Sequence, residues 1–149
     1  MLTGKIRLAT VEGEGRQFIA QAGSGHALVI DTKDGNTGPR PVELVLLGLG
    51  GCTAFDVIGI LRKKRQHVTG YEVAVTAEQR EEYPKVFTKV KIHHILRGRI
   101  DREAVERAIH LSETKYCSVS AMLSCSAEIA ITYEIIAESV PEAAGEVAQ

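Results

Sequence analysis

The sequence predicts an α+β fold, in which strands and helices are grouped instead of alternating regularly. Short alternating segments separated by glycine-rich turns fill the first thirty residues, and a long apolar region follows at Val42–Ile60. Two more alternating segments, a helical pattern and a last alternating segment complete the chain. The 149 residues fit one domain with a core of its own. We expect that domain over residues 1–137, with a flexible acidic tail at 138–149.

The N-terminal region predicts three short strands joined by turns. Apolar and polar residues alternate, and glycines at positions 13, 15, 23 and 25 mark the turns between the segments. A β-meander is therefore expected, with strands at Lys5–Val11, Gln17–Gln21 and Ala27–Asp31.

The apolar region predicts two consecutive helices. The first is expected to begin near Pro41, because proline is tolerated in a first helical turn. Glu43 follows where a carboxylate suits the positive end of the helix dipole. Gly50-Gly51 predicts a break, and a second helix is expected over Cys52–Gln66. That helix is apolar around most of its circumference, so we expect it to be central and covered in part by a second subunit of a homodimer.

The second half of the chain predicts two paired strands, two helices and a final strand. Tyr71–Glu78 alternates apolar and polar residues, and Val90–Leu96 repeats the pattern after a turn near Glu82–Pro84. Asp101 has the side chain of an N-cap and begins a helix that is expected to reach Tyr116. A short helix and a last strand follow at Ser118–Leu123 and Ala127–Ile135.

Composition argues against several classes of partner. The formal net charge is −1, the chain has no tryptophan, and only seven residues are aromatic, so we expect no nucleic acid partner. An uninterrupted apolar run of about 18 residues does not occur, so no membrane partner is expected. The N-terminus is a poor signal peptide, and three cysteines are not a secreted disulfide framework. A reducing cytoplasm is the expected location.

Two cysteines in dissimilar settings are the candidate reactive groups. Cys52 follows the glycine cluster and opens the second expected helix, where the dipole favours a thiolate. Cys117 comes just after the later helical pattern. Each is also compatible with a buried structural cysteine, which packs as a small apolar residue. Cys125 is expected to be structural, because a helix over 117–125 would separate the two Cα atoms by about 12 Å, beyond the roughly 7 Å limit for a disulfide.

No metal and no bound cofactor are expected. His93 and His94 are adjacent in a strand and point to opposite faces, and the chain contains no HxH, HxxE or CxxC ligand pair. Gly48-x-Gly50 followed by Thr53 leaves a dinucleotide-binding turn as an alternative. The missing βα repeats disfavour it.

The segment Gly38–Thr53, together with Lys115–Val119 about 65 residues further on, resembles the OsmC/Ohr family and, within it, the branch of YhfA-like proteins. The resemblance extends over most of the chain. It implies an OsmC-like fold, with a curved, mainly antiparallel β-sheet and two long central helices in an intertwined homodimer.

The resemblance also implies an activity and its residues. Peroxidase members of the family act in the oxidative stress response, reduce organic and fatty-acid hydroperoxides, and are recycled by an external dithiol of lipoyl or another type. By match, Cys52 is the peroxidatic thiol, Cys117 the resolving thiol, and Glu43 the carboxylate that holds an active-site arginine. No arginine matches that position cleanly, and the candidates by location are Arg16, Arg40 and Arg80.

The sequence therefore predicts a thiol-dependent peroxidase for organic hydroperoxides. Cys52 is expected to become a sulfenic acid, which Cys117 converts to a disulfide. Leu47, Phe55 and Met122 are candidates for an apolar lining of the site. The alternative is a non-catalytic protein on the same fold that binds a small apolar molecule or acyl chain, or responds to redox conditions.

Overall fold

A computed structural model describes residues 1–9 and 15–138. The described chain divides into an N-terminal unit, which ends at Leu47, and a C-terminal unit, which begins at Gly48. The long helix α1 (Pro41–Lys63) begins in the first unit and continues in the second. The expected turn at Gly13, the end of the first expected strand and the tail from residue 139 lie outside the described residues.

The N-terminal unit contains the expected meander. Strands β1 (Gly4–Leu8), β2 (Phe18–Ala22) and β3 (Ala27–Ile30) form an antiparallel sheet in that order. The loop after β3 is organised by Asp31, which accepts hydrogen bonds from the backbone N–H groups of Thr32 (2.7 Å) and Thr37 (3.2 Å) and from the Thr37 hydroxyl. These bonds, above all that from the Thr37 hydroxyl, lower the pKa of Asp31.

The apolar region forms one continuous helix of 23 residues, so the predicted break at Gly50-Gly51 is wrong. Gly50 allows α1 to pack closely against the strand that contains Val75. A Cβ atom at position 50 would lie 3.1 Å from Val75 Cγ1. Cys52 therefore lies in the middle of α1, away from any helix start. The dinucleotide-binding alternative is also wrong, because Gly48-x-Gly50 lies inside a helix and does not link a strand to a helix start.

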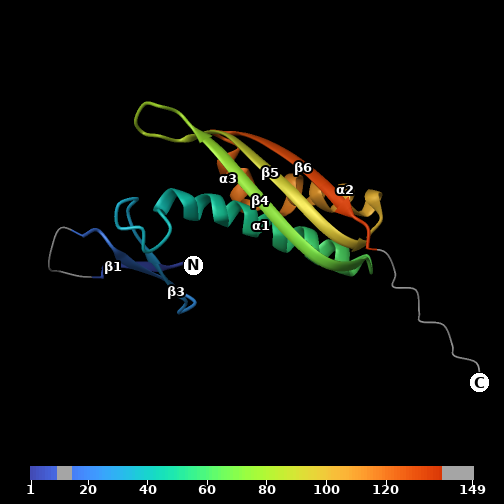
Figure 1. Ribbon diagram of the computed structural model, residues 1–149, viewed down its shortest axis with the longest axis horizontal. Coiled ribbons are helices and arrows are strands. Elements are labelled where there is room, and N and C mark those ends of the chain that lie inside the picture. Colours follow the sequence, from blue (N-terminus) through green and yellow to red (C-terminus); the bar gives the residue numbers. More distant parts are fainter. Residues whose placement is uncertain (10–14, 139–149) are drawn as a thin grey trace, which may run out of the picture. The chain divides into compact units, whose positions relative to one another are not determined.

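The C-terminal unit is a three-stranded sheet covered by helices (Figure 1). Strands β4 (His67–Gln79) and β5 (Phe87–Arg99) are antiparallel, and β6 (Glu128–Ile136) pairs with β5 in parallel. The connection to β6 consists of α2 (Arg102–Leu111), a π-helical turn (Ser112–Tyr116) and α3 (Ser118–Leu123). Asp101 caps α2, as predicted, by accepting a bond from the Ala104 N–H at 3.0 Å. The α+β class and the order of elements expected for this half are confirmed.

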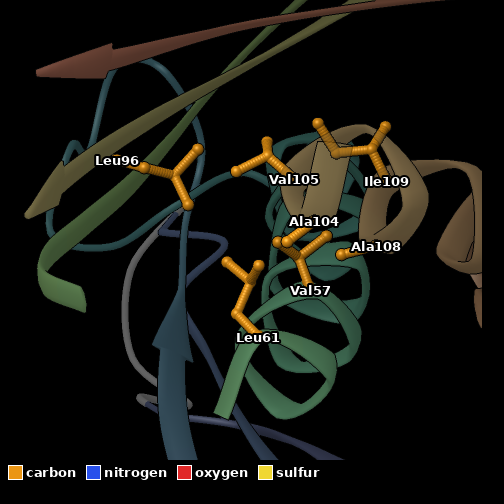
Figure 2. Close-up of a cluster of buried hydrophobic side chains, with 7 residues drawn as sticks. All are labelled: Val57, Leu61, Leu96, Ala104, Val105, Ala108 and Ile109. Carbon is orange, nitrogen blue, oxygen red and sulfur yellow. The ribbon is translucent and has the colours of Figure 1, made fainter. Parts of the chain in front are cut away.

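The core of the C-terminal unit lies between the helices and one face of the sheet. Residues of β5 alternate between buried and more exposed, and Leu96, one of the buried ones, packs with side chains of the helices. Figure 2 shows the centre of this core, in which side chains of α1 and α2 meet Leu96 of β5. Its members are all buried: Val57, Leu61, Leu96, Ala104, Val105, Ala108 and Ile109.

The helix α1 has the length and the composition of a membrane-spanning helix, with a mean hydropathy of 2.1 in its most apolar window. The core helix of a water-soluble domain has the same properties. Three α1 side chains, Leu49, Val57 and Leu61, are completely buried, and the last two belong to the core cluster. Core packing therefore accounts for these three positions, whereas 28% of the most apolar window as a whole is buried.

His94 is a buried titratable group in β5. Its ring is inaccessible, and Nδ1 lies 2.7 Å from the Tyr71 hydroxyl. Nε2 has no hydrogen-bond partner among the described residues. Burial, with a smaller contribution from nearby His93, lowers the pKa of His94 to about 4. The His94 ring is therefore neutral in the folded protein at neutral pH.

We predict that the protein loses stability as the pH falls from 6.5 towards 4. In that window the unfolded chain protonates His94 and the folded chain does not, so the free energy of unfolding should fall by about 2 kcal/mol between roughly pH 7 and pH 4.5 from this residue alone. Urea unfolding at the two pH values measures the difference. His94→Gln should reduce it, whereas His26→Gln, at an exposed site, should not; an unchanged difference in His94→Gln would contradict the assignment.

Candidate active site

The C-terminal unit brings Cys52, Asp56 and Cys117 together. The two sulfur atoms and a carboxylate oxygen of Asp56 all lie within 4.8 Å of one another. Cys52 and Asp56 are four residues apart on α1, which places them on one face of the helix. Cys117 reaches them from the start of α3, 65 residues further along the chain. The predicted pairing of two distant cysteines in one site is therefore present in the fold.

Cys117 is positioned by the turn that separates α2 from α3. The backbone N–H of Cys117 donates to the Ser112 carbonyl at 2.8 Å and closes the π-helical turn. Cys117 then adopts an extended backbone as the N-cap of α3, and its sulfur accepts a hydrogen bond from the Ser120 N–H at 3.4 Å. The side chain is almost fully buried, with 3% exposure.

Ser112 links the π-helical turn to α1. Its buried hydroxyl donates to Asp56 Oδ2 at 2.9 Å and lies 3.1 Å from the Thr53 hydroxyl. The first bond fixes the Asp56 carboxylate beside the sulfurs. Sequence reasoning missed Asp56, although its position four residues after Cys52 in a helical pattern was a usable signal.

The local environment makes the two thiols unequal. Burial is the main cause that raises the pKa of Cys117 to about 11; the Cys52 thiol and the Asp56 carboxylate raise it further, and the Ser120 N–H opposes them. Cys117 is therefore protonated at neutral pH. Cys52 is half-buried, so it is the more accessible sulfur of the pair. Its expected activation by a helix N-terminus does not apply, because it lies in the middle of α1.

Glu43 belongs to the N-terminal unit and forms a helix cap with Arg40. It accepts a bond from the Arg40 backbone N–H at 2.8 Å and from the Arg40 guanidinium Nε at 2.9 Å. The hydrogen bond from the guanidinium is the largest cause that lowers the pKa of Glu43. Among the three candidate arginines, Arg40 is thus the partner of Glu43, while Arg80 donates to the Pro84 carbonyl and Arg16 is exposed. The bond to the backbone is the capping-box pattern of an acidic residue at the third helical position.

A pocket of about 400 Å³ adjoins the cysteine site through Asp56. Phe55 contributes to it, as expected, whereas Met122 is not among its lining residues and Leu47 belongs to the N-terminal unit. The lining is mainly apolar but includes an aspartate and two lysines: Phe55, Asp56, Gly59, Ile60, Lys63, Lys64, Leu111 and Tyr116. Such a pocket suits a small apolar molecule.

Cys125 is exposed beyond the end of α3 and is not part of the cluster. Its sulfur lies 3.7 Å from the Ala121 carbonyl. Cys125 can therefore serve as an internal control, because reactions that depend on the cluster should occur at Cys52 and Cys117 and not at Cys125.

The fold is that of an OsmC-like protein. The sequence profile of the family described as "OsmC-like protein" matches residues 33–134, and the chain belongs to this family. It is 45% identical to Protein YhfA of Escherichia coli K12 over 125 residues, which are 83% of this chain and 93% of that protein. The resemblance inferred from the two cysteine motifs is confirmed.

Solved structures agree with this assignment. A hypothetical protein from Aquifex aeolicus VF5 has a TM-score of 0.81 and 30% identity, and the match covers 93% of this chain and 98% of that one. The organic hydroperoxide resistance protein OhrB of Bacillus subtilis has a TM-score of 0.60 at 13% identity, covering 90% and 98% of the two chains. The second likeness concerns the fold alone.

We predict that mild oxidation joins Cys52 to Cys117 within one chain and leaves Cys125 free. The two sulfur atoms lie within 4.8 Å of each other, and a disulfide forms when they close to about 2.05 Å. Peptide mapping by mass spectrometry after treatment with a small excess of peroxide identifies the bond. A Cys117–Cys125 bond or an intersubunit bridge as the main product would refute the pairing.

Proposed function

We propose that this protein is a thiol-dependent peroxidase that reduces organic hydroperoxides with Cys52 and Cys117. The observation that carries the proposal is the meeting of two distant thiols in one cluster, next to an apolar pocket. The chain belongs to the OsmC-like family, and the solved structures that resemble it include an organic hydroperoxide resistance protein. Both findings support the proposal. A reducing cytoplasm fits the chemistry, because both thiols must be reduced at the start of each cycle.

The reaction proceeds in three steps. Cys52, as a thiolate, attacks the distal oxygen of the hydroperoxide and the O–O bond breaks. The alkoxide takes up the proton that the Cys52 thiol released, it leaves as the alcohol, and Cys52 becomes a sulfenic acid. Cys117 then attacks the sulfenic sulfur, water leaves, and a disulfide forms. An external dithiol reduces this disulfide by exchange and is itself oxidised.

Access and ionisation assign the first step to Cys52. Cys52 is half-buried, whereas Cys117 is almost fully buried and its raised pKa keeps it protonated. Asp56, one helical turn from Cys52, is one of the residues that line the pocket, so an alkyl hydroperoxide bound there would lie close to the pair. Cys117 reacts only after oxidation, when the sulfenic sulfur is a neighbouring electrophile.

A non-catalytic binding protein is the second candidate. The observation that favours it is the absence, among the described residues, of a lysine or arginine in an ion pair with Asp56 beside the two sulfurs. The same pocket would then hold an apolar molecule or an acyl chain, and the thiols would report redox conditions. Reaction with hydroperoxides separates the two candidates.

We predict that Cys52→Ser abolishes consumption of cumene hydroperoxide, whereas Cys117→Ser still permits one oxidation per chain. In Cys117→Ser the sulfenic acid at Cys52 has no resolving thiol, so dimedone should trap it. Stopped-flow kinetics and intact mass measure the two effects, and Cys125→Ser is the matched control that should behave as wild type. If Cys52→Ser still consumes peroxide, the assignment of Cys52 as the attacking thiol is wrong. If the wild-type protein does not react with the hydroperoxide, the binding protein is the better candidate.

We also propose that the protein is a homodimer, because apolar side chains of the C-terminal unit remain exposed around α1 and the connection to β6. Phe55 is 80% exposed and Met122 is 65% exposed. Phe55 and Tyr116, which is 48% exposed, line the same pocket, and contiguous exposed apolar surface commonly marks an interface.

Light scattering at micromolar concentration should therefore give twice the chain mass of 16.2 kDa. Phe55→Glu should shift the protein towards the monomer, because a charge would be buried at the interface. Lys5→Glu, an exposed change in the N-terminal sheet, serves as the control. A monomeric wild type would contradict the proposal.

A further inference from the structure

We propose that Cys52, Asp56 and Cys117 form a binding site for a divalent metal ion that accepts sulfur ligands, with Zn²⁺ as the physiological ion. Two thiolates and one carboxylate are ligands that Zn²⁺ prefers. The site requires reduced sulfurs but does not require that the protein react with peroxides, so it stands independently of the proposed activity.

The positions of the three side chains suit a tetrahedral ion. Their ligand atoms lie within 4.8 Å of one another. In a tetrahedral zinc site, bonds of about 2.3 Å to sulfur and about 2.1 Å to oxygen place the ligand atoms about 3.6–3.8 Å apart. The ligand atoms therefore need to approach one another by at most about 1 Å. Three protein ligands leave a fourth position open to water or another small ligand, as in catalytic zinc sites.

Two of the three ligands are held by hydrogen bonds from groups behind them. Ser112, itself buried, donates to Asp56 Oδ2 at 2.9 Å and leaves the other carboxylate oxygen available. The Ser120 N–H donates to the Cys117 sulfur at 3.4 Å and supports negative charge there. Such outer hydrogen bonds orient ligands in metal sites and increase their affinity.

The charge of the cluster also favours a cation. Among the described residues, no lysine or arginine forms an ion pair with Asp56; the ion pairs found there are Arg40–Glu43 and His93–Glu134. Two thiolates beside the carboxylate would gather three negative charges, which a divalent ion largely neutralises. On binding, both S–H protons pass to water as two sulfur–metal bonds form, and no electrons are transferred.

The three proposed ligands, Cys52, Asp56 and Cys117, do not form a short sequence motif. The expectation of no metal rested on the lack of HxH, HxxE and CxxC pairs. A cysteine and an aspartate four residues apart on one helical face also present two ligands side by side. The third ligand comes from Cys117, which is brought in by the fold.

The test is a titration of fully reduced protein with Cd²⁺ in the absence of oxygen, read by sulfur-to-metal charge-transfer absorption, followed by competition with Zn²⁺. We expect one ion per chain, displaced by Zn²⁺, with both Cys52 and Cys117 protected from alkylation and Cys125 still reactive. Cys125→Ser should bind as wild type does. Asp56→Asn keeps an acceptor for Ser112 and should weaken binding at least about tenfold, while Ser112→Ala should weaken it by about tenfold.

The absence of one-to-one binding in the reduced wild type would overturn the site. Equal affinity in Asp56→Asn would also overturn it, because the carboxylate would then not be a ligand, and so would a loss of binding in Cys125→Ser. Reaction with cumene hydroperoxide is measured separately on metal-free protein. A chain that binds Zn²⁺ but leaves hydroperoxides intact supports the metal site and removes only the peroxidase proposal.

Discussion

The approach of the start of α3 to the middle of α1 is the constraint on which the site depends. Cys117 reaches Cys52 because the π-helical turn ends α2 and redirects the chain, and because Ser112 ties that turn to α1 through Asp56 and Thr53. The core cluster beneath, formed by side chains of α1, α2 and β5, holds the two helices against the sheet. The geometry of the thiol pair is therefore a property of the packed unit, and neither cysteine motif determines it alone.

Burial, with a smaller contribution from Asp56, sets the character of Cys117. Both raise the pKa of this cysteine and keep it a thiol, which suits a resolving residue. The Asp56 carboxylate also brings a negative charge to the site. The same charge attracts a cation. A site of this kind can hold a metal ion when reduced and form a disulfide when oxidised, and these two states exclude one another because both use the same two sulfur atoms. Metal binding and peroxide reduction are thus competing uses of one arrangement.

Much of the fold was predictable from alternation and capping. In the strands around Tyr71 and Ile92, apolar side chains recur at every second residue. Asp101 is a typical N-cap residue and predicts the start of α2. The predicted break at Gly50-Gly51 failed because a glycine in a helix can serve close packing, here against Val75, a contact that only the tertiary fold reveals. Glu43 was read as a candidate active-site residue and as a helix-start carboxylate; its cap with Arg40 gives it the second role, and the first stays a prediction. The cysteine pairing came from a family resemblance. Asp56 could not be predicted as a site residue from a motif, because a single aspartate on a helix is usually exposed to solvent and only the fold shows that it lies beside two sulfurs.

The most direct test of the account is a redox titration of the Cys125→Ser variant in glutathione buffers, followed by intact mass. If Cys52 and Cys117 form one reactive pair, the chain should lose two hydrogen atoms in a single two-electron transition, without mixed glutathione adducts at equilibrium and without covalent dimers. Two independent glutathione additions, or a disulfide between chains, would show that the sulfurs do not act together and would contradict the site described above.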